Sequence, residues 1–448
     1  QVISVNLEHY FTDRTVLTWK NFGIFGERNS VGNTAVNTTA DLANATTGEF
    51  SARRLDRDRY ENYGSELRLK TSYDLLGKTS SLATGARYYR GELGRHQNAL
   101  GTRGSDYDLT TTRKYLVNLS FITENVALFA ENKFQLTDKF AITAGARYEN
   151  IINNGTGYTD TTVAGKFTSP QRTQSFVLLG AGTEYKLNAN NTLYGNISQS
   201  YRPITFADFT NNASNTIVID PNLKAASGYS ADLGLKGFFN SWLGYDAGVF
   251  FINYDNRVGQ YTVGSGANSV ITRGNIGRSV HKGIEAGIDV LPFELFKISK
   301  AGNLKLNYNL GLLDARYVSW EVPTGVSSQD GRWVENAPGI ISRVNVNYSI
   351  KKLSAVFSWS HVGETYSNAN NSAANFSRTA NGNDGKIPSY NVLDLSVRYE
   401  VNKIVSLSAS INNLTNNHYF TRRAGGYPGP GIMPADGRTA LITLGIKL

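Results

Sequence analysis

The chain of 448 residues contains no cysteine and only ten prolines. The absence of cysteine excludes a disulfide scaffold, Cys-ligated zinc, iron–sulfur clusters and thiol catalysis. Because proline is scarce while Leu, Val and Ile are plentiful, the composition is not that of a disordered chain. The fold must therefore be stabilised by the burial of apolar side chains, without disulfide bonds or cysteine-bound metal ions.

Charged residues and long apolar runs are also scarce. Charged residues make up 18% of the chain, below the usual share of about 25%. No stretch approaches the roughly 18 consecutive apolar residues of a membrane helix, which excludes a helical membrane protein but leaves a membrane β-barrel open. The net charge of +9 suits nucleic acid, anionic lipid or a small anionic ligand, and does not choose among them.

What the chain does contain is a hydrophobicity pattern that repeats every two residues. Apolar residues alternate with polar, charged or small ones in several segments: 140–149, 304–312, 343–350, 393–401 and 440–448. Such alternation is typical of strands with one apolar and one polar face. No segment sustains a period of 3.6, so we expect almost no helix. The apolar phase includes four aromatic residues that suit an interfacial girdle: Tyr148, Tyr308, Trp359 and Tyr399.

The connections between these segments come in two lengths that alternate. Short polar turns are expected near 12–14, 77–79, 137–139, 188–191 and 402–403. Long loops rich in Gly, Asn, Ser and Thr are expected at roughly 27–56, 92–114, 155–172, 204–227, 319–337, 367–386 and 414–436. A bacterial outer-membrane barrel has this arrangement, with tight periplasmic turns and long outer loops. The polar phase also carries charges at mid-strand, which a dry sandwich core would not tolerate.

Counting between the turns predicts an all-β fold: a transmembrane antiparallel β-barrel of about 17 strands in one domain, residues 1–448. Single-chain bacterial barrels have an even number of strands with both ends in the periplasm. An odd count places the first strand on the outer side. Gln1 is also not an initiator Met. We therefore expect the chain to begin inside a larger barrel.

Four groups of residues in the second half add a more specific signal. They are Asp220–Lys224 with Tyr229–Lys236, Asn275–Gly277 with Lys282–Glu285, Asn412–Asn416 with His418–Phe420, and Pro434–Arg438. In this order they resemble motifs in the C-terminal barrel of TonB-dependent outer-membrane receptors, above all the ferric dicitrate receptor group. The family's usual final Phe is Leu448 here, which is still apolar.

The resemblance implies a barrel of 22 strands, of which this chain would supply the last 17. The N-terminal plug, which carries the TonB box, and about five strands would lie upstream of Gln1. The implied function is TonB-coupled uptake of a ferric chelate, such as ferric citrate or a siderophore-like anion. The implied partners are the TonB complex, reached through the plug, outer-membrane lipid and lipopolysaccharide.

The densest charge cluster, Arg53–Arg59, has four arginines and two aspartates where a long loop becomes a strand. A solvated loop end with weak ion pairs is one interpretation. The other is a site for a carboxylate-rich chelate, since arginine offers paired donors in a fixed geometry. Within the cluster we favour Arg54 and Arg57 as ligand contacts.

A second candidate lies in the last long loop, where Arg422 and Arg423 precede a Gly-rich run that a ligand could approach closely. A flexible surface loop is the alternative. Arg202 and Arg273 are weaker candidates for the lumen or a loop, and outward basic residues near the outer rim could instead contact lipopolysaccharide.

Other functions have weaker support. The five histidines show no metal-ligand spacing and no HExxH motif, so we expect no enzyme, metal site or cofactor. Nucleic-acid binding would need a basic, aromatic-interleaved face on a recognised module. Three alternatives stay open: a barrel subunit that mainly serves as an interaction partner, for example of a surface lipoprotein or a secretion machine; a TonB-dependent transporter of a non-iron nutrient; and a passive porin, which the motif series disfavours.

Overall fold

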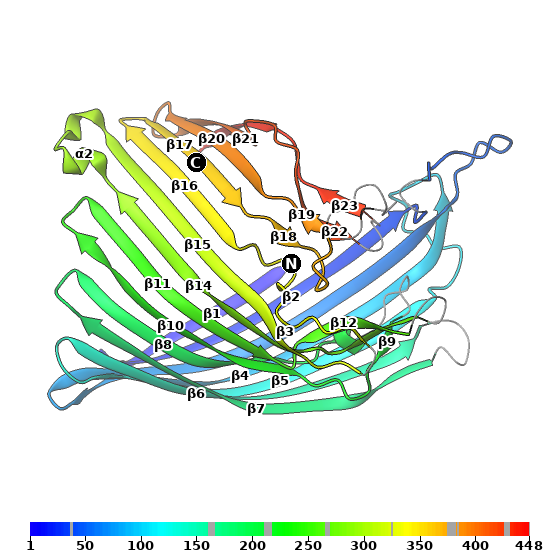
Figure 1. Cartoon of the computed structure of the whole chain (residues 1–448), viewed down its shortest axis with the longest axis horizontal. Coiled ribbons are helices and arrows are strands. Elements are labelled where there is room, and N and C mark those ends of the chain that lie inside the picture. Colours follow the sequence, from blue (N-terminus) through cyan, green and yellow to red (C-terminus); the bar gives the residue numbers. More distant parts are fainter. Residues whose placement is uncertain are drawn as a thin grey trace.

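The computed structural model consists of one strongly curved β-sheet, with the short loop strands gathered at one end of its strands and the short helix α2 Pro292–Leu295 at the other (Figure 1). It describes residues 1–35, 39–159, 166–209, 217–264, 269–323, 326–373, 382, 385–424 and 431–447, although not the side chains of 166–170, 209 and 299. Within these residues no helix is long and apolar enough to cross a membrane.

Seventeen strands form the main sheet, which confirms the predicted number. They are β1 Val2–Thr12, β2 Thr15–Gly32, β3 Ala52–Leu75, β4 Lys78–Arg103, β5 Val117–Gln135, β6 Phe140–Tyr158, β7 Lys166–Lys186, β8 Asn191–Arg202, β10 Ala226–Phe239, β11 Leu243–Asp255, β14 Gly277–Val290, β15 Asn303–Trp320, β16 Ile340–Ile350, β17 Leu353–Val362, β20 Tyr390–Glu400, β21 Val405–Asn412 and β24 Thr439–Ile446.

The remaining elements are short and lie between strands of the main sheet. They are the strands β9 Val218–Ile219, β12 Val258–Val263, β13 Val270–Asn275, β18 Thr365–Tyr366, β19 Lys386–Ile387, β22 Phe420–Ala424 and β23 Gly431–Pro434, the helices α1 Phe206–Phe209 and α2 Pro292–Leu295, and the 3-10 turn η3 Ser299–Ala301. Near-absence of helix was expected from the missing 3.6 period.

Each main-sheet strand pairs antiparallel with the next one along the chain. The predicted short turns lie where expected. The β3–β4 turn shows why two residues suffice there: Leu76 and Gly77 both have positive φ, 52° and 72°. That backbone matches the twist of the flanking strands in a two-residue hairpin.

The loop boundaries were predicted less well, because several strands run into the segments expected to be loops. β2 continues to Gly32, β3 already begins at Ala52, and β4 extends to Arg103. Of the loop predicted at 155–172, the first residues belong to β6 and the last to β7. Polar residues occur on both faces at the outer ends of these strands, so the alternation fades where the strand still continues.

The register separates the two faces as the alternation predicted. On one face Leu395 pairs with Phe357, which pairs with Val346 and then Leu306. Directly opposed residues of an antiparallel pair point to the same side of the sheet. Leu395, Val397 and Tyr399 therefore share one face, and Asp394, Ser396 and Arg398 share the other. The four predicted girdle aromatics all lie in the apolar phase: Tyr148, Tyr308, Trp359 and Tyr399.

The polar face is stabilised by its own side chains, which form a chain of hydrogen bonds across four strands. Ser358 Oγ donates to Asn345 Oδ1 at 2.8 Å, and Asn345 Nδ2 donates to Asn307 Oδ1 at 3.0 Å. Asn307 Nδ2 donates in turn to Asp289 Oδ1 at 2.7 Å, and Lys305 pairs with Asp289 at 2.9 Å. Mid-strand polar residues on this face thus have partners of their own.

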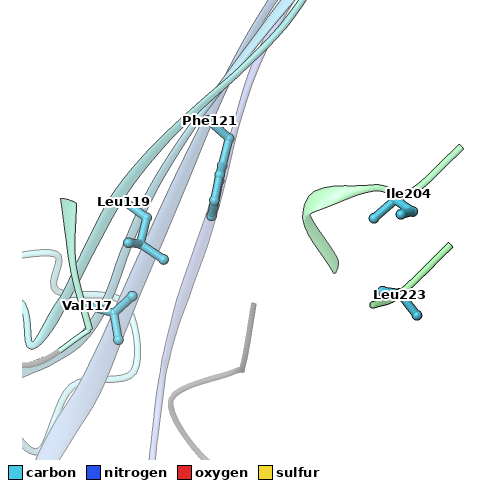
Figure 2. Packing of buried hydrophobic residues seen from close by; sticks show 5 residues of the cluster. All are labelled: Val117, Leu119, Phe121, Ile204 and Leu223. Atoms are coloured by element: carbon cyan, nitrogen blue, oxygen red, sulfur yellow. The ribbon is translucent and has the colours of Figure 1, made fainter. Parts of the chain in front are cut away.

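The polar face is the concave one, because loop segments fold back over it. Between β8 and β10 the chain crosses to β5, where Phe206 stacks on Phe121 with ring centroids 4.3 Å apart. Figure 2 shows the β5 side chains Val117, Leu119 and Phe121 beside the segment carrying Ile204 and Leu223, and the five form a buried apolar cluster. The connection that leaves β8 passes back over three strands to reach β5, and its shortest path runs across the inside of the curved sheet. Phe121 and the residues paired with it in the neighbouring strands therefore point into the lumen.

One seam interrupts the sheet. β7 and β8 pair only up to Gly180 and Ser198. Beyond that point glutamine side chains accept hydrogen bonds from the backbone. Gln199 Oε1 accepts a hydrogen bond from the Leu179 N–H at 3.0 Å, and Gln174 Oε1 accepts one from the Ile204 N–H at 2.9 Å. An open groove of about 710 Å³ lies along this part of the sheet. Two glutamines therefore satisfy backbone groups that a regular ladder would have paired.

The sheet has two free edges within the described residues. β1 pairs with β2 alone, and β24 pairs with β21 alone. The residues of β1 are exposed throughout, including Val2, Val5 and Leu7. In this structure the sheet is thus curved but open.

Candidate functional site

The structure places the two favoured arginines of the first cluster on opposite faces of β3. The β2–β3 register runs without a bulge and pairs Gly32 with Arg54 and Asn29 with Arg57. Arg54 is three positions from Arg57, so it lies in the lumenal phase while Arg57 lies in the outer phase. The sequence interpretation treated them as one site, and the pleat separates them.

Their environments differ as well. Arg54 Nε binds Asp56 Oδ1 at 3.0 Å, and the side chain is mostly covered. Arg57 is 40% exposed and lies 3.5 Å from Glu27, with a further hydrogen bond from its Nε to Asn29 Oδ1 at 3.2 Å. Exposed pairs of this kind hold their side chains weakly. Arg57 is thus the more available cation, although it faces outward.

A buried carboxylate lies in the same cluster, further along β3. The Asp58 side chain is 1% exposed and is paired with Arg28. Gln97 Nε2 also donates to Asp58 Oδ1 at 3.2 Å. Because a buried charge needs both an ion partner and hydrogen bonds, this group stabilises the upper ends of β2, β3 and β4 and is not available to a ligand.

Arg53, which the sequence interpretation did not single out, anchors two loops. Its side chain is 4% exposed and reaches Asp41 at 2.8 Å and Asp106 at 2.9 Å. The guanidinium also lies 5.3 Å from the Phe50 ring centroid. The hydrogen bond to Asp41, aided by the charge of Asp106, raises the pKa of Arg53 against the opposing effect of burial. No local sequence signal reveals this role, because both aspartates are distant along the chain.

We expect Arg53→Met to loosen both loops. The substitution keeps most of the apolar contact but removes the cation shared by Asp41 and Asp106, at an expected local cost of about 1–3 kcal/mol. Limited proteolysis of the folded receptor should show faster cleavage within 39–50 and 104–110. The matched control is Arg57→Met, which should cost about 0–1 kcal/mol because its pair is exposed. Equal protease sensitivity of both variants would contradict the anchoring role.

The two arginines of the second candidate, Arg422 and Arg423, also have different environments. Arg423 is buried, donates to the carbonyl oxygens of Gly382 and Lys386 at 2.7 Å each, and lies 4.9 Å from the Phe420 ring centroid. Arg422 is exposed and pairs along the backbone with Met433 in β23. Arg423 therefore fixes the β22–β23 hairpin to the neighbouring loop, and Arg422 is presented to solvent. The Gly-rich run at 425–430 lies outside the described residues.

The two weaker candidates, Arg202 and Arg273, both contact the segment around α1. Arg202 pairs with the buried Asp208 at 2.8 Å. Arg273 donates to the carbonyl oxygen of Ala207. Both arginines thus help to hold the segment that folds back over the lumen.

Three further arginines line the lumenal face and were not singled out from the sequence. Arg68 and Arg147 approach the Phe129 ring from two sides, with centroid distances of 5.8 and 5.6 Å. Arg87 lies 5.5 Å from the Phe22 ring centroid. All three occupy the polar phase of their strands, which is the signal that could have identified them. Arg68 is paired with Glu66 and Arg147 with Glu149, so this part of the lumen wall is aromatic and carries charges of both signs.

Comparison with known proteins agrees with this architecture. The family model for the TonB dependent receptor-like β-barrel matches residues 1–414. A probable TonB-dependent siderophore receptor, PiuA of Acinetobacter baumannii, is 24% identical over 330 residues, which are 72% of this chain and 40% of that protein. The chain thus spans less than half the length of this curated relative.

Solved structures share the fold. The crystal structure of the siderophore receptor PiuA from Acinetobacter baumannii superposes with a TM-score of 0.73 at 20% identity, covering 99% of this chain and 64% of that one. The unliganded ferric citrate transporter FecA gives 0.78 at 16% identity, covering 99% and 60%. The ferric-catecholate import receptor Fiu from K12 E. coli, in its closed form, gives 0.70 at 16% identity, covering 99% and 63%.

The alternating strands, the polar concave face and the long loops at one end are thus those of a known group of barrels. The family match extends over more than nine-tenths of the residues. This chain belongs to the TonB-dependent receptor-like β-barrel family.

Proposed function

We propose that the chain forms the barrel wall of an outer-membrane receptor that takes up a ferric chelate by TonB-coupled transport. The observation that carries the proposal is the match to the TonB-dependent receptor barrel over residues 1–414. The names of relatives support the cargo class, since they include a probable siderophore receptor and a ferric citrate transporter. In this proposal a plug and further strands complete the receptor, and the plug receives the pull from TonB.

The choice of an anionic chelate is supported by the cations that the loops present. Arg422 is exposed on β22, and Arg54 lies in the lumenal phase near the outer end of β3. A citrate-like ferric complex is rich in carboxylates, which arginine binds with charge-assisted hydrogen bonds. We propose Arg422 as the first contact, with Arg54 and the buried Arg423 shaping the site behind it, and Arg57 remains a candidate on the outer side.

A copper cargo has less support, although one similar structure is that of a copper transporter, OprC. Copper(I) is selected by thiolate and thioether ligands. The chain has no cysteine and one methionine, Met433. A chelate held by cations and hydrogen bonds fits this donor set better than a bare soft metal ion.

Uptake itself is tested in cells that lack their own ferric-chelate receptors. Expression of the intact receptor should restore accumulation of radioactive iron from ferric citrate or from a siderophore complex, and deletion of TonB should abolish the gain. Accumulation that is independent of TonB would support a passive pore and overturn the proposal. If the receptor takes up no ferric chelate but takes up another nutrient in a TonB-dependent way, the cargo belongs to a different chemical class.

The proposed contact is tested by Arg422→Gln. The change keeps hydrogen-bonding capacity but removes the charge, and loss of a charged hydrogen bond costs about 1.5–3 kcal/mol. We expect ferric citrate to bind roughly tenfold or more weakly. Titration of the solubilised receptor measures this, with heat-modifiability as the folding check.

Arg57→Gln is the matched control, because Arg57 is also exposed but lies in the outer phase. If Arg57→Gln weakens binding and Arg422→Gln does not, the ligand site lies on the β2–β3 side of the mouth. If neither variant changes the affinity, the exposed arginines are ordinary surface cations.

A further inference from the structure

A small cavity lies among the outer loops, separate from the arginines discussed above. It has a volume of about 260 Å³. We call it the loop cavity, and its walls come from β12, the end of β15, the loop that follows β15, and the segment after β18. The residues that matter for its chemistry are Gln260, Tyr261, Trp320, Gln329, Asn368 and Asn370.

The walls of the loop cavity are fixed by contacts behind them. Trp320 packs edge-on against the buried Tyr317, with centroids 4.9 Å apart and planes at 86°. The two loops are joined by a reciprocal pair of bonds: Trp333 N–H donates to Asn371 Oδ1, and Asn371 Nδ2 donates to the Trp333 carbonyl, both at 2.8 Å. The cavity is therefore a built feature of the fold. It is also much larger than the roughly 10–15 Å³ that a single water needs.

Two wall residues have an unsatisfied polar atom. Gln329 is 4% exposed, and its Nε2 donates to the Ser327 carbonyl at 3.0 Å, while its Oε1 has no hydrogen-bond donor among the described residues. The Trp320 Nε1 likewise has no acceptor there. Each such buried atom costs about 1–3 kcal/mol. A ligand that draws both side chains a short way into the cavity recovers that cost.

The lining also defines the charge of the ligand. Among the residues that line the loop cavity in the structure there is no Asp, Glu, Lys, Arg or His. The nearby Arg332 guanidinium donates to the carbonyl oxygen of Asn370 and is not itself part of the lining. An ionic group would therefore enter without a counter-charge in the lining, which is unfavourable. The cavity instead offers two aromatic rings and several amides, each of which both donates and accepts hydrogen bonds. A neutral ligand with many hydroxyl groups matches this set, because a hydroxyl both donates and accepts. Once the two buried side chains turn toward the cavity, a hydroxyl can donate to Gln329 Oε1 or accept from Trp320 Nε1.

We propose that the loop cavity binds a neutral sugar ring. The aromatic side chains of Tyr261 and Trp320 cover the apolar faces of the ring, and the amides bind its hydroxyl groups. This site goes beyond the proposed uptake of a ferric chelate and does not depend on it. The ring could be presented by a glycosylated chelate or by a surface saccharide, and the chemistry of recognition is the same.

The test is saturation-transfer NMR and calorimetry on the intact solubilised receptor with defined probes. The probes are the methyl α-pyranosides of glucose, mannose and rhamnose, with glucose 1-phosphate as the charged comparison and N-acetylglycinamide as the amide comparison. We expect saturable binding of at least one methyl pyranoside, and weaker binding of both comparisons. The absence of saturable binding by all three pyranosides would overturn the proposal, as would a preference for the amide or for the phosphate.

Trp320→Phe removes the unsatisfied N–H and keeps an aromatic ring, while Gln329→Leu removes the unsatisfied oxygen at similar size. Each should weaken pyranoside binding by roughly threefold to tenfold, the effect of one hydrogen bond. Trp333→Phe is the matched control, since its ring lies 3.7 Å from the Arg316 guanidinium and does not line the cavity. An equal loss in Trp333→Phe would overturn the site assignment.

The origin of the sugar is settled with two larger ligands that carry the same rings. A core oligosaccharide released from lipopolysaccharide and a glucosylated ferric chelate are titrated onto the wild-type receptor and onto Trp320→Phe. The ligand that binds more tightly and loses more affinity in the variant is the natural source. If neither depends on Trp320, the loop cavity is not a sugar site.

Discussion

Two single-cysteine receptors that differ by one position are expected to react in opposite ways with a water-soluble maleimide. Ser396→Cys places the thiol on the polar face of β20, and Leu395→Cys places it on the apolar face. In lipid vesicles the first should label almost completely and the second almost not at all. A thiol inside the hydrocarbon has no contact with the reagent, whereas the interior of such barrels is polar.

These 448 residues contain no native cysteine, so each variant introduces a single thiol into this part of the receptor. A gel shift after reaction with a bulky maleimide gives the labelled fraction in intact vesicles. Both variants should label equally after denaturation, which is the control for reactivity. Faster labelling of Leu395→Cys than of Ser396→Cys in folded vesicles would mean that the assignment of faces is inverted.

A second large effect is expected for the 448-residue chain expressed with no other segment. It should fail to give the compact, heat-modifiable band of a closed barrel on a gel run without boiling. The reason is the pair of edges, β1 and β24, which have no partner on their outer side within the described residues. In hydrocarbon each unsatisfied backbone group costs several kcal/mol, and a membrane sheet must therefore close.

The intact receptor, refolded in the same detergent, is the control and should show the shift on heating. Pairing of edges between copies would give higher oligomers that grow with protein concentration. A monomeric, heat-modifiable band from the 448 residues alone would show that β1 and β24 join directly, and would contradict the open sheet.

The strands could be predicted from the sequence because their signal is local. In membrane-spanning segments such as 393–401 one face must be apolar, so alternation is strict and the face of each residue follows from its neighbours. The limits of β2, β3 and β4 were missed because polar residues occur on both faces of their outer ends, where groups such as Asp58 and Gln97 are buried against neighbouring parts of the chain. The β7–β8 seam was also not predictable, since it depends on which glutamine side chains reach across to backbone groups.

The candidate site was predicted in outline only. The sequence showed that basic residues concentrate at Arg53–Arg59 and at Arg422–Arg423, and the structure places both groups toward the loop end. It could not show that Arg54 and Arg57 diverge, since that needs the register with β2. Nor could it show that Arg53 and Arg423 are buried, because their partners, such as Asp106 and Gly382, become neighbours only after the loops fold.

The order of the strands has a consequence for how the molecule folds. Since each strand pairs with the next one along the chain, every new pairing closes only the connection between neighbouring strands, and the entropic cost of closure grows slowly even for the long loops. Such local pairings form quickly, whereas contacts between distant parts of a chain are slow. The sheet can therefore grow one hairpin at a time from any point. The slow step is then the pairing that closes the sheet, because it joins strands that are far apart along the chain.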